Sequence, residues 1–463
     1  MKSLINNMTN KTMKLNSLLL KQNIIKKNIV NLKSFKGYNS FSSSTISDKG
    51  AYVFDKNNRS KTVVVGISGG VDSSTSAYLL KEAGYNVIGL YMKNWDASDE
   101  HGIEECPAES DFKDVKLVCD YLNVPVHRVN FVKEYWQEVF TPFIEGYENG
   151  LTPNPDVLCN KQIKFNKFLD KAKELGADYV ATGHYVRTID EYDENSSTKE
   201  KRIKLLCGLD PGKDQSYFLS FVNTNALRNV LFPVGNMHKE DVRKIAKEAG
   251  LPTADKKDSY GICFIGKRDF RDFIDGYIHR KPGYFRNVEN INEIVGTHES
   301  CVFYTIGQQS KISGAQQKWY VCDKDYFTND VIVAKGRNHP SLYCNYVKLN
   351  TTNFHWVNNN KPPSKLVNYD YDNDDGGEMK GMCRIRHRQS LTSCTFKLKG
   401  AELIVYFDSP QYAATPGQVC ALYCTDGIEC YGGGIIEEKG ESYYEMGYSE
   451  MVDIDKDVGN HAF

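Results

Sequence analysis

Hydrophobic positions along this chain follow two patterns, one in each half. Between residues 61 and 272, short apolar runs rich in β-branched residues alternate with longer stretches of helical periodicity. Strands that alternate with helices favour a parallel α/β sheet. The predicted strands are 62–67, 86–92, 124–130 and 177–182, and the predicted helices are 71–82, 111–122, 131–147, 160–175 and 238–249.

The second half has a different texture. From about residue 281 the apolar runs are short and turn residues separate them, which is typical of small β domains and barrels. Strands are predicted at 299–306, 319–323, 331–334, 394–398, 403–407 and 418–423. Two polar stretches, 190–202 and 358–381, are predicted to be an exposed loop and a disordered insert.

These patterns divide the chain into five parts. The predicted parts are a presequence or disordered segment 1–60, an α/β domain 61–272, a central β-rich domain 273–338, a C-terminal β-barrel 339–440 and an acidic tail 441–463. A length of 463 residues is enough for about three domains. No apolar run approaches the roughly 18–20 residues of a membrane-spanning helix, so no membrane contact is expected.

Charge is distributed unevenly along the chain. It has 58 basic and 59 acidic residues, yet residues 1–47 contain eight lysines and no acid. This segment resembles a mitochondrial presequence, which predicts a location in the matrix. Its lack of Arg keeps open the alternative of a disordered Lys/Asn-rich extension. The remainder carries a formal charge of −9, so any binding of nucleic acid requires a local basic patch.

Thirteen cysteines are too few for a disulfide scaffold in so long a chain, and no two have C-x2-C spacing. Zinc ribbons and thioredoxin-type motifs therefore have no support, and a reducing compartment is favoured. Most of the cysteines should be buried as small apolar side chains. A cysteine with a chemical role has to be identified from its neighbours.

The strongest local motif is the Gly-Ile-Ser-Gly-Gly-Val-Asp-Ser-Ser segment at 66–74, between a predicted strand and a predicted helix. Its glycines allow close approach of a phosphate, to which helix-start N–H groups and Ser hydroxyls can donate. No Gly-Lys-Ser/Thr follows, so it is not a Walker A loop. It resembles the PP-loop of ATP pyrophosphatases, which cleave ATP between the α and β phosphates and adenylate a substrate. The alternative is an ordinary Gly-rich turn.

Two further motifs contain a cysteine each. In 152–161, two prolines precede Cys159, which we expect at or near a helix start, where Lys161 and Lys164 favour its thiolate. Asp156 could serve the same substrate as an acid or base. In 257–266, Cys263 lies in a short apolar run between glycines. Taken alone, each cysteine would more often be structural than chemically active.

Together, and in this order, the three motifs resemble the tRNA-specific 2-thiouridylase family, in its mitochondrial form. The similarity extends from about residue 62 to 437. Further matching segments are 91–96, 181–185, 208–219, 303–308, 384–389, 415–418 and 432–436. The resemblance implies a Rossmann-like PP-loop catalytic domain, a small central β-rich domain and a C-terminal β-barrel.

The resemblance also implies a chemistry. ATP would adenylate the oxygen on carbon 2 of a wobble uridine in tRNA, and sulfur would replace AMP. The implied ATP contacts are Gly66, Ile67, Ser68, Gly69, Gly70, Val71, Asp72, Ser73, Met92 and Gly183. Asp72 is expected to act through Mg2+, a cation that prefers oxygen ligands.

The implied roles of the two cysteines are different. Cys263 matches the cysteine that carries the persulfide, and Cys159 matches the nucleophile that helps to release its sulfur. A Cys159–Cys263 disulfide results in one version of the mechanism, and free hydrogen sulfide forms in the other. Asp156 matches the general acid/base. An upstream persulfide donor must supply the sulfur.

The implied RNA partner is tRNA, with those for Lys, Glu and Gln as the expected substrates. The target base has to be flipped out, because its carbon 2 is otherwise inaccessible. The implied tRNA contacts are Asn154, Pro155, Asp156, His184, Lys213, Asp214, Gln215, Arg386, His387 and Gln418. Two alternatives are another PP-loop adenylating enzyme, which would not need the two cysteines, and a non-catalytic RNA-binding protein, which would not need an intact loop.

Overall fold

The computed structural model describes residues 56–96, 107–192, 201–258, 264–265, 268–358, 361–367 and 377–450. Cys263, nearly all of the predicted segment 1–60 and the end of the predicted tail lie outside these residues. Within the described ranges, no helix combines the length and the apolar character needed to cross a membrane.

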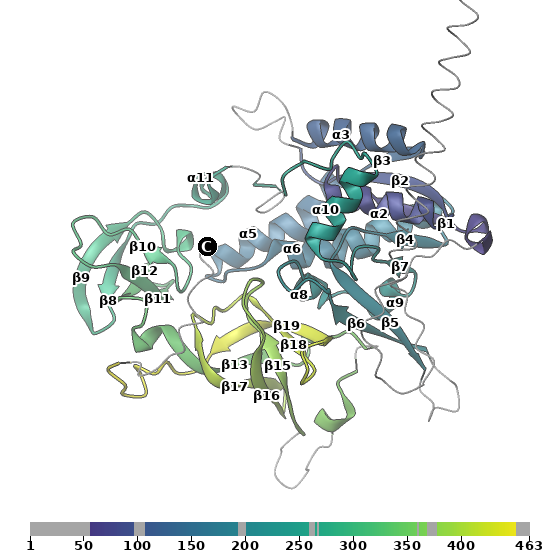
Figure 1. Cartoon of the computed structure of the whole chain (residues 1–463). Helices are drawn as coiled ribbons and strands as arrows, with labels where there is room; N and C mark the ends of the chain where they lie inside the picture. The colour runs from purple at the N-terminus through teal and green to yellow at the C-terminus, as the bar shows by residue number, and fades with distance from the viewer. Residues whose placement is uncertain are drawn as a thin grey trace, which may run out of the picture. The chain divides into compact units, whose positions relative to one another are not determined.

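A five-stranded parallel sheet forms the centre of the first domain (Figure 1). Its strand order is β3-β2-β1-β4-β7, and every neighbouring pair is parallel. The strands are β1 Thr62–Gly66, β2 Asn86–Lys93, β3 Val126–Asn130, β4 Tyr179–Ala181 and β7 Val230–Leu231. The chain order reverses at β1, which lies between β2 and β4. In open α/β sheets, ligands bind beyond the carboxyl ends of the strands at such a switch point.

Helices cover both faces of this sheet. Successive valines of β1 are fully buried on opposite faces. Val63 and Val65 pack with α2 (Val71–Glu82), α3 (Pro107–Leu122) and α10 (Lys239–Glu248), and Val64 packs with α5 (Thr141–Glu148), η3 (Cys159–Lys167) and α7 (Phe168–Glu174). The predicted α/β class is therefore confirmed. The helices are η1 Lys56–Ser60, α2 Val71–Glu82, α3 Pro107–Leu122, α4 Val132–Tyr135, η2 Trp136–Phe140, α5 Thr141–Glu148, α6 Pro155–Leu158, η3 Cys159–Lys167, α7 Phe168–Glu174, α8 Ser216–Leu219, α9 Thr224–Leu227, α10 Lys239–Glu248 and α11 Phe270–Asp275.

The central domain contains a second sheet, ordered β10-β11-β12-β8-β9. Its strands are β8 Gly283–Asn287, β9 Asn290–His298, β10 Gln309–Ser310, β11 Trp319–Asp325 and β12 Asp330–Lys335. The predicted strand 299–306 is wrong, because this stretch contains the 3-10 helix η4, Cys301–Phe303. All three η4 residues are buried, so its apolar run reflects burial of a short turn and not strand alternation.

The C-terminal domain is a closed barrel of six strands. Strands β13, β17, β16, β15, β18 and β19 pair in this order, and β19 pairs with β13 to close the ring. The strands are β13 Tyr343–Asn350, β14 His355–Trp356, β15 Glu378–Arg384, β16 Thr392–Lys399, β17 Glu402–Tyr412, β18 Val419–Tyr423 and β19 Glu429–Lys439. Two 3-10 turns, η5 Pro340–Leu342 and η6 Ser364–Leu366, complete it.

A hairpin from the first domain extends the barrel sheet. Strands β5 (Val186–Tyr192) and β6 (Lys201–Cys207) are antiparallel, and β6 pairs with β19 through Leu205 and Leu206. The predicted loop 190–202 is therefore too long at both ends, because its charged residues form the arms of the hairpin. The first domain and the barrel therefore share one β-sheet.

Two other predicted boundaries also change. The predicted disordered insert 358–381 includes η6 and the first four residues of β15, which pair with β16 across their backbone. Within the predicted tail, Ser442 bridges to Cys344 and the ring of Tyr443 packs on Tyr448, so the tail begins with ordered structure. The polar composition of these two stretches did not indicate this order, because strand pairing uses backbone groups and does not require apolar side chains.

Candidate active site

The glycine-rich loop follows β1 and leads directly into α2. Gly69 has φ +79°, and a Cβ there would lie 2.8 Å from the carbonyl oxygen of Asp111. The Ser73 hydroxyl accepts from the Ser68 N–H at 3.2 Å and donates to the Gly70 carbonyl at 3.1 Å, which fixes the turn. Gly70 is the N-cap of α2 and has no side chain with which to cap it, so helix-start N–H groups remain for a ligand.

Buried hydroxyls line the helix that follows. Ser74, Thr75 and Ser76 each donate to the carbonyl of the residue four positions earlier, at 2.8–2.9 Å. This back-bonding satisfies polar side chains that lie against the sheet. The Ser-rich sequence can therefore form a buried helix just behind the loop.

The structure brings Gly183 and Met92 to the same edge of the sheet as the loop. Gly183 follows β4, and a Cβ at this position would lie 2.8 Å from the Ser73 nitrogen. Met92 lies near the end of β2, the neighbour of β1. Loop, Gly183 and Met92 therefore lie at the switch point of the sheet, as their predicted role in ATP binding requires.

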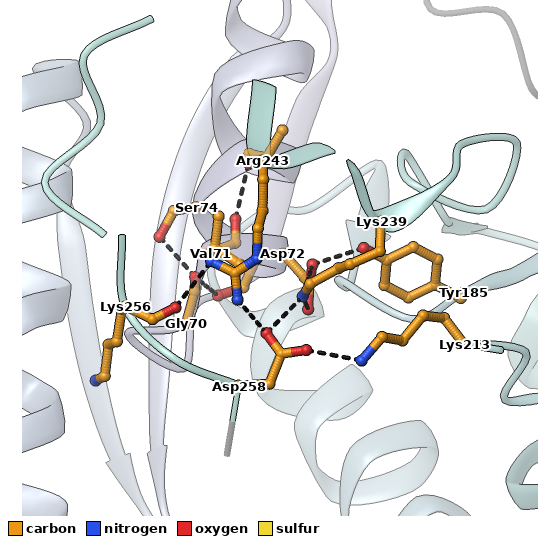
Figure 2. A network of polar contacts seen from close by, with 12 residues as sticks. Gly70, Val71, Asp72, Ser74, Tyr185, Lys213, Lys239, Arg243, Lys256 and Asp258 are labelled. Atoms are coloured by element: carbon orange, nitrogen blue, oxygen red, sulfur yellow. Dashed lines mark hydrogen bonds and ion pairs between the residues drawn. The ribbon is translucent and has the colours of Figure 1, made fainter. Parts of the chain in front are cut away.

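A network of charged side chains adjoins this loop (Figure 2). The Lys239 ammonium donates to both carboxylate oxygens of Asp72, at 2.7 and 2.8 Å, and lies 2.9 Å from Asp258. The Tyr185 hydroxyl also donates to Asp72, at 2.7 Å. Lys239 is the first residue of α10 and is buried, so its charge is held inside the site.

Asp258 is the second centre of the network. It accepts from Lys213 at 2.7 Å and from Arg243 at 2.6 Å. Burial acts to raise the pKa of Asp258, but the hydrogen bonds from Lys213 and Lys239 outweigh it and lower that pKa to about 2. Asp258 is therefore a carboxylate at neutral pH.

The segment that ends at Asp258 is attached to the loop region on two sides. Arg243 donates to the carbonyls of Ala254 and Lys256, at 3.2 and 3.0 Å. The Lys256 ammonium donates to Asp111 and Asp114 of α3, at 2.9 and 2.6 Å. Residues 254–258 are thus fixed between α10 and the part of α3 that faces the glycine loop.

The helix that contains the Cys159 motif begins at Pro155, five residues before the predicted start at residue 160. Asn154 is the N-cap of α6, its side-chain oxygen accepts from the N–H groups of Asp156 and Val157, and Pro155 occupies the first turn. Cys159 therefore lies one turn inside the helix, buried, at the first position of the π-helix η3. π-Helical turns are rare in proteins overall, but those that occur are often found at functional sites.

Asp156 and Lys164 set the electrostatics of this helix. Burial raises the pKa of the Asp156 carboxyl above its usual value, and the charge of Lys164 opposes the rise. A carboxyl that holds its proton more readily is suited to act as an acid. Asp156 precedes Cys159 by three residues, which places both on one side of the helix.

Several residues predicted to contact tRNA connect the barrel to the first and central domains. The Gln418 amide donates to the Thr152 carbonyl at 2.5 Å, and Arg386 donates to Ile306, Ala413 and Thr415. The buried carboxylate of Asp214 pairs with Arg384 at 2.9 Å. These side chains have internal partners, so the barrel braces the loop that precedes Cys159. Their tRNA contacts stay a prediction.

The remaining predicted RNA residues are distributed differently. Lys213 points to Asp258, and the Gln215 side chain accepts from the Tyr185 N–H at 3.0 Å, so both lie near the glycine loop. His184 is buried against Phe165, and burial, with Lys164, holds its pKa well below the usual range. Burial, with Arg384 and Arg388, lowers the pKa of His387 to about 4. Both imidazoles are neutral at pH 7 and cannot attract phosphate by charge.

Four residues of the site were not predicted. The sequence assigns no role to Tyr185, Lys239 or Arg243, and Asp258 lies in the motif 257–266, where Cys263 alone is assigned one. Their partners lie far away in the sequence: Lys239 is 167 positions from Asp72. A lysine at the start of a helix has no local signal for this contact, so only the fold could reveal it.

Three family models match the chain in succession. They are described as the tRNA methyl transferase HUP domain, the tRNA methyl transferase PRC-barrel domain and the aminomethyltransferase β-barrel domain, and they match residues 61–267, 271–335 and 347–436. These ranges coincide closely with the α/β domain, the central sheet and the barrel.

Individual proteins are also similar over most of their length. The tRNA-specific 2-thiouridylase MnmA of Protochlamydia amoebophila is 46% identical over 389 residues, covering 83% of this chain and 96% of the relative. The proteins of the same name from Geobacillus thermodenitrificans and Klebsiella pneumoniae are 44% and 46% identical, over 391 and 387 residues. These alignments cover 83% and 82% of this chain, and 98% and 97% of the relatives.

Proposed function

The chain belongs to the tRNA-specific 2-thiouridylase family, and from this premise we propose that it replaces the oxygen on carbon 2 of a uridine in tRNA by sulfur, at the expense of ATP. The observation that carries the proposal is its 44–46% identity to proteins of that name over nearly their whole length. Although the family models are described by methyl transfer, a PP-loop and a buried helical cysteine in one domain suit adenylation followed by sulfur transfer.

ATP fits the loop. The glycines at 69 and 183 leave room where a Cβ would lie 2.8 Å from a backbone atom, and the start of α2 offers N–H groups to the phosphates. Adenylation joins the carbon 2 oxygen to the α-phosphate and releases pyrophosphate. AMP then becomes the leaving group, which a carbonyl oxygen alone is not.

Mg2+ is the second part of the ATP proposal. Among the described residues, no three His, Cys, Asp or Glu side chains lie together as a ready metal site. Mg2+ commonly uses one or two carboxylates and takes its other ligands from substrate phosphates and water. Asp72, in the first turn of α2, is the carboxylate that would contribute, in exchange for part of its contact with Lys239.

Sulfur transfer is assigned to the two cysteines. A persulfide on Cys263 would attack carbon 2 and displace AMP, and the Cys159 thiolate would then attack Cys263, leaving the thiocarbonyl and a Cys159–Cys263 disulfide. A dithiol reductant must restore the two thiols. Asp156 would hold or deliver the proton at the adenylated oxygen.

The test is a reconstituted reaction with an unmodified tRNA for Lys, Glu or Gln, ATP, Mg2+ and a persulfide donor. Mass spectrometry should detect 2-thiouridine at the wobble position, together with one pyrophosphate per turnover. Cys159→Ser should abolish thiolation while retaining pyrophosphate release and a persulfide on the protein. Cys263→Ser should carry no persulfide. Wild-type thiolation by Cys263→Ser would refute the two-cysteine mechanism.

A mitochondrial location is part of the proposal. It is supported by the acid-free, lysine-rich segment 1–47, which precedes the first residue matched by the family models. Residues 1–60 fused to a fluorescent protein should accumulate in mitochondria. Diffuse fluorescence throughout the cytosol would refute the location and leave the enzymatic proposal untouched.

A further inference from the structure

One buried ammonium group connects the glycine loop to a distant segment. The side chain of Lys239 is 11% exposed, and its nitrogen lies within 3 Å of carboxylate oxygens of both Asp72 and Asp258. Asp72 belongs to the loop and α2, whereas Asp258 ends the segment 254–258. Lys239 is therefore shared between the glycine loop and a second segment (Figure 2).

Three cations converge on one carboxylate beside Lys239. Lys213, Lys239 and Arg243 each pair with Asp258, while Asp72 pairs with the Lys239 ammonium and Asp210 accepts from the Lys239 backbone N–H at 2.9 Å. Each cation has Asp258 as a partner, so this one carboxylate offsets charge that would otherwise face the loop. Three cations next to a phosphate-type loop are suited to binding a polyphosphate.

We propose that Lys239 is the cation that binds the ATP polyphosphate, and that Asp258 is the counter-ion which the phosphates replace. The inference rests on the proposed use of ATP at this loop. Before nucleotide binds, the Asp258 carboxylate forms ion pairs with Lys239, Lys213 and Arg243. On binding, phosphate oxygens take over the Lys239 ammonium, and no covalent bond changes.

The geometry identifies Asp258 as the group that is exchanged. Asp72 is also held by the Tyr185 hydroxyl and lies on the loop itself, so it stays with the phosphates and any metal ion. Asp258 lies on a different segment and is bound mainly through these three cations. A ligand that competes for the cations therefore competes with Asp258 first.

The first experiment measures binding of ATP and of pyrophosphate by isothermal titration calorimetry, with Mg2+ and without tRNA. Lys239→Met should weaken binding about ten- to hundredfold, the usual range for one hydrogen bond to a charged group. Lys239→Arg should restore most of the affinity. Lys247→Met is the matched control, because Lys247 is exposed on the same helix and pairs with Asp255. Wild-type affinity in Lys239→Met would overturn the proposal.

The second experiment distinguishes a counter-ion from a merely structural residue by the sign of the effect. Asp258→Asn removes the competitor, so ATP and pyrophosphate should bind several-fold more tightly, with a steeper dependence on salt. Asp255→Asn removes the same charge three residues away, where the side chain is 87% exposed, and should change neither. Unchanged or weaker binding by Asp258→Asn would overturn the assignment of the counter-ion.

These measurements need no tRNA and no sulfur donor, so they stand apart from the test of the reaction. If the wild-type protein binds ATP but makes no 2-thiouridine, the proposed function fails and the binding comparison still decides the role of Lys239. If it makes 2-thiouridine while Lys239→Met binds ATP normally, only this inference fails. Thermal melting of each variant checks that it is folded.

Discussion

Replacing Arg384 by methionine should destabilise the contact between the barrel and the first domain. Arg384, in β15, donates to Asp214 at 2.9 Å, and the two side chains are 9% and 2% exposed. The Asp214 carboxylate also accepts from the Gly208 N–H and from the Ser216 N–H and hydroxyl. The substitution would leave this carboxylate buried without its cation.

The expected cost follows from that environment. Removing one partner of a buried ion pair costs about 3–5 kcal/mol, and the three remaining donors to Asp214 place Arg384→Met near the lower limit, about 3 kcal/mol. Asp214→Asn alone should cost about 2–3 kcal/mol, because Arg384 then loses its carboxylate. The double variant removes both charges and should cost only about 2 kcal/mol in total.

The assay is urea unfolding followed by circular dichroism and by intrinsic fluorescence, with separate fits if the two probes report separate steps. Lys348→Met is the control, because its pairs with Glu402 and Glu438 are on the barrel surface and their loss should leave the curve nearly unchanged. Additive costs of the two single substitutions, within about 0.5 kcal/mol, would refute the coupling between Asp214 and Arg384.

Three further predictions concern the site. Asp156→Asn should abolish thiolation yet raise the melting temperature at pH 7. Folding raises the pKa of Asp156, so the wild-type protein becomes less stable as the pH rises above about 4 and the unfolded chain ionises this carboxyl more readily. Equal melting temperatures of the variant and the wild type at pH 7 would contradict this. Gly183→Ala should eliminate ATP binding, measured by calorimetry, since its Cβ would lie 2.8 Å from the Ser73 nitrogen, whereas Gly276→Ala, with its nearest atom at 3.6 Å, should bind normally. Gln418→Ala should lower the turnover rate without changing the tRNA dissociation constant, because its amide holds Thr152; weaker tRNA binding at an unchanged rate would show instead that it contacts RNA.

Much of the fold follows from local patterns. The run Thr62–Gly66 is apolar on both faces because its valines face helices on both sides, and a continuous apolar run is the signature of such a strand. The 3-10 turn Cys301–Phe303 is equally apolar, so composition predicted a strand there. Both segments are apolar because both are buried. Whether a buried segment is a strand or a turn depends on backbone pairing with residues that are distant in the sequence.

The candidate site shows the same division. Glycines 69 and 183 leave a signal in the sequence because close approach to a backbone atom restricts each position to glycine. The partners of Asp72 could not, since Tyr185 and Lys239 come from separate elements. The prolines before Asp156 suggested a later helix start, but Asn154 caps the helix and Pro155 is well suited to its first turn.

The pairing of β6 with β19 has a consequence for the order of folding during synthesis. β6 ends at Cys207 and β19 begins at Glu429, about 220 residues later. At roughly 5–20 residues per second, a ribosome needs on the order of 10–40 s to make the intervening chain. For that time one edge of the β5–β6 hairpin has no partner strand, and an open edge is a site for aggregation. The sequence of this strand contains Lys201, Arg202 and Lys204, and such charges protect an edge strand until its neighbour is made.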